Sequence, residues 1–312
     1  MLKIMLKINY LKTLHYILLA TFSLFTLALL WYLMFALKLQ PMSQKDIFAQ
    51  YEYQHNPSLD ISFVAIDEHN LQFSYHSFDG EVVYGQISYP KKQAEHYPVL
   101  IGISAMGRSY VRWWADSFNG NPTLTQVDKI AQLANQQGYV VVAIDARFHG
   151  KRKQKSLPLS KIMNNLHLWG DRKGYLNMIT NTVKDHRVLL DWLMEQTQFS
   201  VGKVTVAGYS MGGQISLLLA SVDSRIDKVI AIAPPFINDK VAAVAPKNLV
   251  PNMRNASTLL MTASNDEYAS QLENNLLFSL INSEKKQRID FDSGHILPAH
   301  YVEQLLPFLA TN

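Results

Sequence analysis

The chain has 312 residues, 48% of them hydrophobic, with no cysteine and a formal net charge of +4. The lack of cysteine excludes disulfides, cysteine-ligated metals, a lipid-modified N-terminal cysteine and a thiol nucleophile. Residues 1–38 contain four lysines and no acidic residue, whereas the rest of the chain is balanced in charge. The basic character therefore reflects a membrane flank and gives no indication of nucleic-acid binding.

A long apolar segment lies close to the N-terminus. No formally charged residue occurs between Thr13 and Leu37, and about 20 apolar residues are enough to span a bilayer as a helix. A cleavable signal peptide has a shorter apolar core and a small-residue cleavage site, and no clean site follows Leu37. We therefore predict an uncleaved signal anchor with a transmembrane helix over about residues 14–37; a cleaved signal and a buried soluble helix are the alternatives.

The charges on either side of this segment predict its orientation. Lys3, Lys7 and Lys12 precede it, and Lys38 and Lys45 follow it. This bias places the N-terminus in the cytoplasm and the rest of the single-pass chain on the outer, periplasmic or extracytoplasmic side.

Composition divides the chain into three parts. Residues 1–38 are the predicted membrane anchor, and residues 39–58, which are largely polar and contain Pro41 and Pro57, are predicted to be a linker. Residues 59–312 are long enough for one catalytic domain with its own core.

The predicted domain begins with strands and continues as an alternation of strands and helices. Three strand-like runs cover residues 61–67, 71–78 and 82–90, and the Asp79-Gly80 pair predicts a hairpin between the last two. From Tyr97 onward, apolar runs alternate with amphipathic stretches, which is typical of a parallel sheet. The further predicted strands cover residues 97–103, 139–144, 204–207, 228–233, 258–263 and 287–291.

The pentapeptide Gly208-Tyr209-Ser210-Met211-Gly212 directly follows the strand of residues 204–207. In strand-then-helix context, G-x-S-x-G indicates a nucleophile elbow, a sharp turn that lifts a serine hydroxyl out of the end of a sheet. Small residues are needed two positions before and after the serine because the backbone is crowded there. Ser210 is therefore the predicted nucleophile, and it needs a base and an orienting acid.

Both partners follow in the expected order. Asp266 comes just after the predicted strand of residues 258–263, and His295 comes after the last predicted strand. The order Ser210, Asp266, His295 is that of the α/β-hydrolases. Glu267 adjoins Asp266, and the sequence leaves open which of the two carboxylates faces the imidazole.

Two backbone N–H groups are expected to form an oxyanion hole. One belongs to Met211, which follows the nucleophile, and the other is assigned to Met106 in the loop after the strand of residues 97–103. Tyr209, Trp113 and Trp114 are candidates for substrate binding; for the two tryptophans, packing against the core is an equal alternative.

The plan of residues 61–309 resembles the α/β-hydrolase superfamily. The runs at residues 77–80, 89–90, 145–150 and 293–298 resemble the dienelactone hydrolase, acetyl-xylan-esterase and prolyl-oligopeptidase branch. The resemblance implies an α/β-hydrolase fold with a mostly parallel central sheet, a hydrolase of esters or less often of peptides, and a structural role for Asp145 and Arg147. His149 is expected to be a solvated loop histidine.

The predicted activity is hydrolysis of a small-molecule carboxylic ester through an acyl-enzyme intermediate, with no metal or organic cofactor. A prolyl-oligopeptidase-like peptidase or an acyltransferase would use the same triad. A catalytically silent binding module displayed at the membrane is the alternative from another class. Acyl and alcohol specificity and the oligomeric state are not predicted from the sequence.

Overall fold

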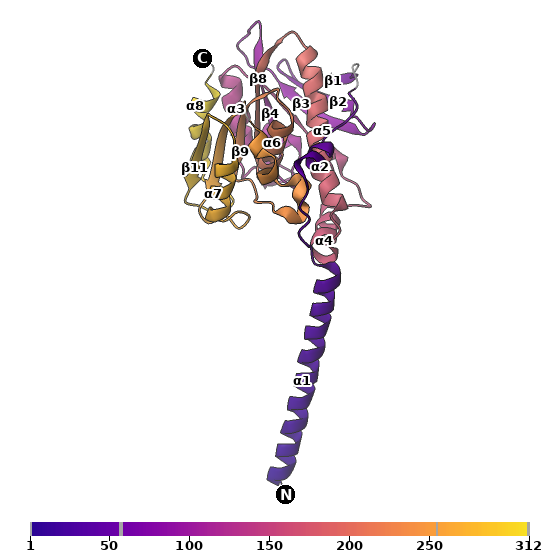
Figure 1. Cartoon of the computed structure of the whole chain (residues 1–312). Coiled ribbons are helices and arrows are strands. Elements are labelled where there is room, and N and C mark those ends of the chain that lie inside the picture. The colour runs from indigo at the N-terminus through magenta and orange to yellow at the C-terminus, as the bar shows by residue number, and fades with distance from the viewer. Residues whose placement is uncertain (1, 56–58, 254, 311–312) are drawn as a thin grey trace.

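A computed structural model describes residues 2–55, 59–253 and 255–310 (Figure 1). In this part of the chain, nine strands form one sheet in the order β1-β2-β3-β7-β4-β8-β9-β10-β11. The first pairings, as far as β3 with β7, are antiparallel, and all later pairings are parallel. The strands are β1 (Ile61–Ala65), β2 (Asn70–His76), β3 (Val82–Ser88), β4 (Tyr97–Ile103), β7 (Val140–Ile144), β8 (Phe199–Tyr209), β9 (Ile226–Ile232), β10 (Ser257–Ala263) and β11 (Lys286–Phe291).

Helices cover both faces of this sheet. Apart from α1 (Leu2–Phe35), which projects away from the domain, the helices are α2 (Gln44–Ala49), α3 (Val127–Gln136), α4 (Leu159–Trp169), α5 (Lys173–Glu195), α6 (Met211–Val222), α7 (Gln271–Leu280) and α8 (Leu306–Leu309). The remaining elements are a small hairpin, β5 (Ser117–Phe118) with β6 (Asn121–Pro122), and the 3-10 helices η1 (Tyr110–Trp113), η2 (Gly150–Arg152), η3 (Asp239–Val244), η4 (Pro246–Asn248), η5 (Val250–Asn252) and η6 (Ala299–Leu305).

The sheet separates two apolar cores. One contains buried residues of α5, α6 and α7, and the other contains buried residues of α3, η6 and α8. All five residues of β7 are buried, as expected for a strand that is covered on both faces. Helix α6 is buried along almost its whole length because its residues are mostly apolar or small, and its buried Gln214, Ser216 and Ser221 side chains bond to backbone carbonyls. The predicted α/β class and mostly parallel sheet are confirmed.

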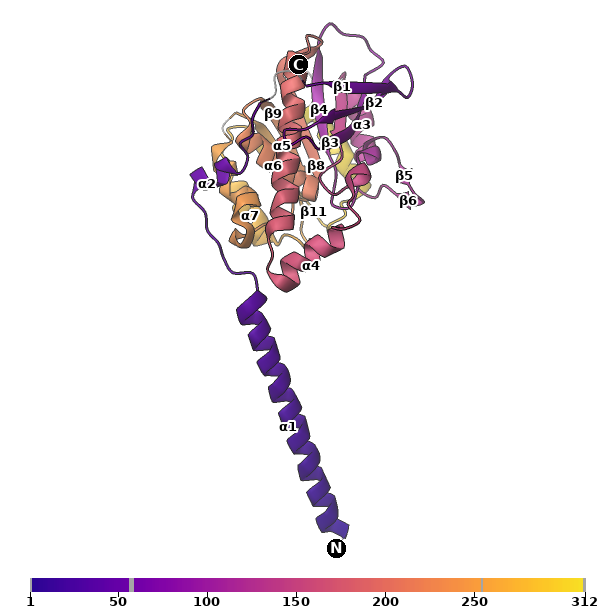
Figure 2. The same ribbon diagram turned by 90° about the vertical axis from the view of Figure 1, so that its right-hand side faces the viewer.

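Helix α1 projects away from the domain and meets it only near its C-terminal end (Figures 1 and 2). Its segment Asn9–Phe35 contains an 18-residue window with a mean hydropathy of 2.1, and the segment is long and apolar enough to cross a membrane. The predicted apolar helix therefore forms, with a start further towards the N-terminus than residue 14 and an end at Phe35.

The segment predicted as a linker is described over residues 39–55. This part contains the short helix α2, which is capped by the Ser43 side chain. Ile47 and Tyr51, four residues apart, are buried against the domain, and the Tyr51 hydroxyl donates a hydrogen bond of 2.7 Å to the carbonyl of Ala243. Two apolar residues on one face are enough to dock a single helical turn, although they are too few to show as a periodic pattern.

Candidate active site

Ser210 lies at the tight turn between β8 and α6, with backbone angles of φ 55° and ψ −119°. This conformation is costly for a non-glycine residue, and two glycines make it possible. A Cβ atom on Gly208 would lie 2.2 Å from the carbonyl oxygen of Gly212, and one on Gly212 would lie 2.1 Å from that of Ile103. The Ser210 N–H donates a hydrogen bond of 2.8 Å to Ile232, which ties the turn to β9.

The three residues predicted as a triad lie in hydrogen-bonding contact. His295 Nε2 is 2.8 Å from Ser210 Oγ, and His295 Nδ1 is 3.0 Å from each carboxylate oxygen of Asp266. The Asp266 side chain is 1% exposed and that of His295 is 12% exposed. The neighbouring Glu267 instead faces the backbone N–H of His295, at 3.4 Å. The geometry therefore favours Asp266 over Glu267 as the partner of the imidazole.

Two tyrosines hold the loop that carries His295. The buried Tyr209 hydroxyl donates to the His295 carbonyl and accepts from the N–H of Leu297, each at 2.8 Å. Burial raises the pKa of Tyr209 to about 12, so its hydroxyl stays protonated and can make both bonds. The Tyr268 ring packs edge-on against the imidazole with a centroid distance of 4.6 Å. Tyr268 was not expected from the sequence, because nothing local distinguishes it from a surface tyrosine.

A cavity of about 700 Å³ opens onto Ser210 and His295. Met106, Met211 and Tyr209 line it, so the structure brings these sequence candidates together. Met211 is the first residue of α6, where a backbone N–H has no partner within the helix. The other lining residues include Arg108, Thr125, Met163, Leu166, His167, Gln214, Phe236, Ile237, Lys240 and Val241.

The two tryptophan candidates lie elsewhere. Trp113 is fully buried against Gly102 of β4, and Trp114 packs against the same core. Neither lines the cavity. Substrate binding was therefore the wrong prediction for both tryptophans, and packing against the core was the right one. A large aromatic side chain gains more from burial between η1 and the sheet than from a solvent-filled site.

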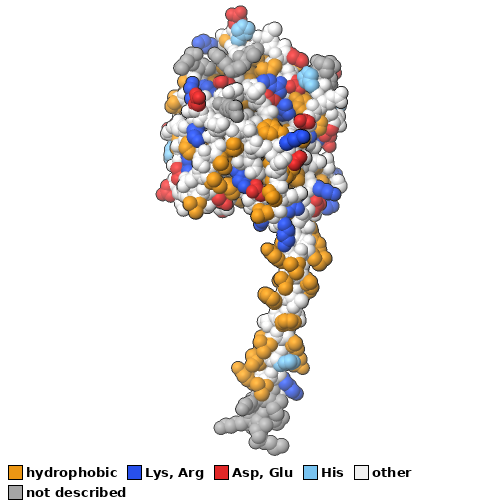
Figure 3. All heavy atoms as spheres, in the orientation of Figure 1, with side chains coloured by type: hydrophobic (Ala, Val, Ile, Leu, Met, Phe, Trp, Pro, Cys, Tyr) orange, Lys and Arg blue, Asp and Glu red, His pale blue; other side chains and the backbone are white. Residues whose placement is uncertain are grey.

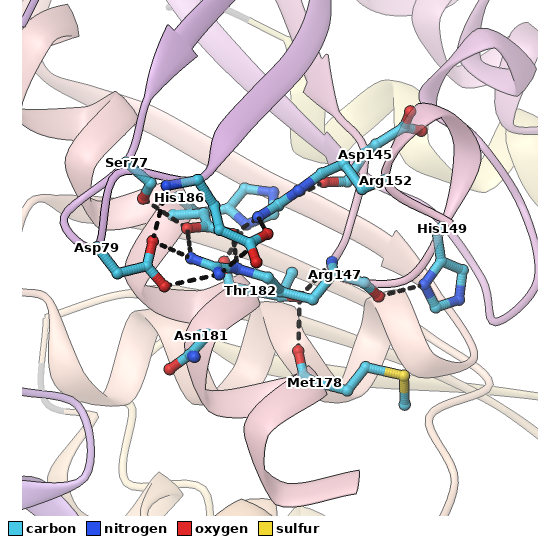
Figure 4. Close-up of polar contacts among 12 residues, drawn as sticks. Ser77, Asp79, Asp145, Arg147, His149, Arg152, Met178, Asn181, Thr182 and His186 are labelled. Atoms are coloured by element: carbon cyan, nitrogen blue, oxygen red, sulfur yellow. Dashed lines mark hydrogen bonds and ion pairs between the residues drawn. The ribbon is translucent and has the colours of Figure 1, made fainter. Parts of the chain in front are cut away.

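A buried ion network holds the loop after β7 (Figure 4). Arg147 lies between Asp79, at 2.7 Å, and Asp185, also at 2.7 Å, and Arg152 contacts Asp185 at 2.6 Å. Asp145 accepts hydrogen bonds from two loop amides, those of Tyr110 and Lys151. None of these residues lines the cavity, in agreement with the structural role that the resemblance implies.

His149 in this loop is buried, so the expected solvated position is wrong. Its Nδ1 donates to the Arg147 carbonyl at 2.7 Å, in the same way as Nδ1 of the buried His186 donates to Thr182. Burial lowers the pKa of both histidines to about 4. The sequence missed this because the loop folds inward to reach Asp185, which is distant along the chain.

These two histidines predict an acid-sensitive stability. In the unfolded chain the two imidazoles bind protons below about pH 6.5, whereas in the folded chain they do so only near pH 4. Their contribution to the free energy of unfolding is therefore complete above about pH 6.5 and is lost as the pH falls towards about 4. We expect the free energy of unfolding to fall by on the order of 1 kcal/mol per pH unit and per histidine in this window. Urea unfolding of the full chain in detergent micelles at pH 8, 6.5 and 5 measures this fall in the free energy of unfolding. A double His149→Gln/His186→Gln variant should flatten the slope, and exposed His300→Gln should leave it unchanged; a flat wild-type profile would contradict the prediction.

No group of three or more His, Asp or Glu side chains that could hold a metal occurs among the described residues. The arrangement that is present, a serine hydroxyl bonded to an imidazole that is in turn bonded to a buried carboxylate, is suited to nucleophilic acyl transfer.

Comparison with known proteins places the chain in a family. The profile of the family described as serine aminopeptidase, S33, matches residues 121–293, more than half of the chain. The curated proteins include no match to it.

Several solved structures share the fold at low identity. Acetyl xylan esterase from Paenibacillus sp. R4 has a TM-score of 0.61 at 14% identity, over 88% of this chain and 96% of that one. A cold-adapted esterase from an Arctic intertidal metagenomic library has a TM-score of 0.58 at 18% identity, over 80% and 98%. A proposed dienelactone hydrolase from Klebsiella pneumoniae has a TM-score of 0.59 at 14% identity, over 82% and 100%. The profile match and this shared fold confirm the resemblance read from the sequence: the chain belongs to the serine aminopeptidase S33 family of serine hydrolases, with the α/β-hydrolase fold.

Proposed function

We propose that the chain hydrolyses carboxylic esters, with Ser210 as nucleophile, His295 as base and Asp266 as the acid that orients it. The observation that carries this proposal is the chain of contacts from Ser210 Oγ to His295 to the buried Asp266, at the floor of one cavity. A serine held in a strained turn beside a correctly oriented imidazole is the arrangement that activates its hydroxyl.

The reaction proceeds in two acyl-transfer steps. Ser210 Oγ bonds to the ester carbonyl carbon while its proton passes to His295 Nε2, and the N–H groups of Met211 and Met106 stabilise the negative oxygen. The bond between the acyl carbon and the alcohol oxygen then breaks, and His295 returns the proton to that oxygen. Water attacks the acyl-enzyme in the same way, which releases the acid and restores Ser210.

The lining of the cavity favours esters over the substrates of an aminopeptidase. An aminopeptidase binds a positively charged amino terminus, which carboxylates recognise well. The described residues that line the cavity include Arg108, His167 and Lys240 but no aspartate or glutamate. A cationic amino terminus would meet like charges there, whereas a neutral ester would not.

An ester panel together with active-site labelling tests the proposed function. We expect the full-length protein in detergent to hydrolyse p-nitrophenyl esters, with an optimum of acyl length set by the cavity. A serine-directed fluorophosphonate should attach to Ser210, as located by peptide mass spectrometry, and should abolish turnover. Labelling without turnover of any ester in the panel would move the assignment to the peptidase alternative, and neither labelling nor turnover would indicate the silent binding module.

We propose further that α1 is an uncleaved signal anchor, with the N-terminus in the cytoplasm and residues 59–312 as the catalytic domain on the outer side. The support is the apolar length of α1, the lysines that precede it and its contacts with the domain. Trp31 donates a hydrogen bond of 2.8 Å to the carbonyl of Leu168, a contact that cleavage after the apolar segment would remove.

Membrane extraction and protease access test this placement. We expect the full-length protein to stay in the membrane pellet after extraction with alkaline carbonate, because an apolar helix of this length inserts stably. Protease added to intact bacterial spheroplasts should digest the catalytic domain, and a cytoplasmic protein should survive as the control. Release by carbonate would contradict the anchor, and protection of the domain in spheroplasts would contradict the orientation.

A further inference from the structure

The C-terminal end of α1 is bound to the domain through helix α4. Besides the bond from Trp31 to Leu168, the ring of Phe35 packs edge-on against that of Trp169 at a centroid distance of 5.1 Å. Gly170, which ends α4 with φ +65°, approaches the Phe35 carbonyl so closely that an added Cβ would lie 2.4 Å from its oxygen. We call this set of contacts the α1 junction.

The chain just after α1 is bound in the same place. Arg172 donates hydrogen bonds of 2.5 Å to the carbonyl of Lys38 and to that of Lys240. Gln40 donates a hydrogen bond of 2.8 Å to the carbonyl of Asp239. The end of α1, the end of α4 and the start of η3 therefore meet at one point. Figures 1 and 2 both show the end of α1 beside α4.

The segments that meet at the α1 junction also form a wall of the catalytic cavity. Leu37 lines the cavity from the chain after α1, Met163 and Leu166 line it from α4, and Val241 lines it from η3. The same cavity reaches Ser210. The wall that joins the membrane helix to the reacting serine is apolar, as a site for a hydrocarbon chain requires.

The surface around the junction has the composition of a membrane interface. Leu168, Trp169 and Leu39 are exposed by 49%, 56% and 68%. The Lys38 ammonium folds back over the Tyr32 ring at 4.0 Å, as lysines do at the end of a spanning helix. Figure 3 shows apolar side chains along α1 and Lys and Arg side chains where the domain meets it.

The polar part of the cavity carries positive charge. Arg108 and Lys240 line it and are exposed, and in the described part of the chain neither side chain has a hydrogen-bond or ion-pair partner. His167 of α4 lies on the same lining, which contains no described carboxylate residue. Unpaired cations beside an apolar wall are complementary to an anionic group attached to an acyl chain.

We propose that the substrate is an acyl ester of an anionic membrane lipid, which enters the cavity from the bilayer surface at the α1 junction. This inference rests on the proposed function. The acyl chain lies along the wall formed by Leu37, Met163 and Leu166, its carbonyl reaches Ser210, and the anionic headgroup lies near Arg108 and Lys240.

The experiment uses the full-length protein in vesicles of a dialkyl-ether phosphatidylcholine, which contains no carboxylic ester bond. The probe is a 1-O-alkyl-2-acyl-phosphatidylglycerol, with one carboxylic ester and two long chains, and the matched probe of zero net charge carries phosphocholine. We expect turnover of the anionic probe to exceed that of the neutral one by about tenfold, the effect of two exposed charge contacts. Turnover of the anionic probe should also be about tenfold faster when protein and probe share vesicles than when they are in separate vesicles.

Charge variants and a soluble ester make the outcomes distinguishable. Arg108→Gln/Lys240→Gln should bring the ratio of anionic to neutral turnover close to one, and the exposed Lys92→Gln, outside the cavity lining, should keep the wild-type ratio. Equal turnover of the two probes, or equal turnover from shared and separate vesicles, would overturn the inference. If p-nitrophenyl acetate is still hydrolysed in a Ser210-dependent way, the proposed function stands; if no ester is hydrolysed, the proposed function fails as well.

Discussion

Ser210→Ala is expected to lower kcat/KM for ester hydrolysis by about 10⁴–10⁶-fold, the cost of removing the nucleophile from a triad. The loss should appear in the chemical step, because the cavity and the proposed oxyanion donors at Met106 and Met211 are untouched. Alanine keeps the Cβ atom and therefore the same backbone constraint at φ 55°, so the fold should be preserved. Steady-state hydrolysis and the thermal unfolding midpoint of the full chain measure the two effects.

A matched serine makes this result interpretable. Ser279 is exposed on α7, and among the described residues its hydroxyl bonds only to the Leu276 carbonyl; Ser279→Ala should keep full activity and full fluorophosphonate labelling. Turnover within tenfold of the wild type in Ser210→Ala, with the unfolding midpoint unchanged, would rule out the proposed mechanism.

Asp266→Asn is the second large effect that we expect, a loss of about 10³–10⁴-fold in kcat. Both carboxylate oxygens lie 3.0 Å from His295 Nδ1. An amide in their place no longer stabilises the imidazolium formed during acyl transfer, and it can favour the wrong tautomer of the ring. KM should change much less than kcat, because Asp266 does not line the cavity.

Glu267→Gln is the control for this variant. Within the part of the chain that the structure describes, its carboxylate accepts one hydrogen bond, from the backbone N–H of His295 at 3.4 Å, so we expect a loss of less than about tenfold. If Glu267→Gln costs as much activity as Asp266→Asn, the assignment of the acid is wrong, and the loop after β10 adopts another arrangement during catalysis.

The parts of the site that could be predicted from the sequence depend on local signals. The glycines around Ser210 are needed by a turn of five residues. Asp266 follows a strand with an easily recognised apolar run, and His295 follows the last predicted strand. Because parallel strands end at one edge of a sheet, the order of the strands brings the three side chains together without any detail of their packing. The choice between Asp266 and Glu267 needed coordinates, since adjacent residues differ only in the direction of their side chains.

The shape of the cavity could not be predicted, because it depends on contacts between distant segments. Helix α4 and η3 lie between predicted strands and have no sequence pattern that would place them over Ser210. Leu37 lines the cavity only because Arg172 and Gln40 hold the chain after α1 against the domain. The position of Trp113 could not be predicted for the same reason. The sequence around an aromatic residue near a site is the same whether its side chain lines the site or packs beneath it.

The α1 junction has a kinetic consequence. Hydrogen bonds and ring packing, rather than a free tether, join α1 to the domain, so the domain cannot tilt far relative to α1. For a chain held in a bilayer by α1, the search for a lipid substrate takes place in two dimensions with its orientation already set, which removes part of the entropic cost of encounter. Velocity would then follow the mole fraction of substrate in the surface and not its bulk concentration, so that surface dilution with an inert lipid slows the enzyme at constant total substrate.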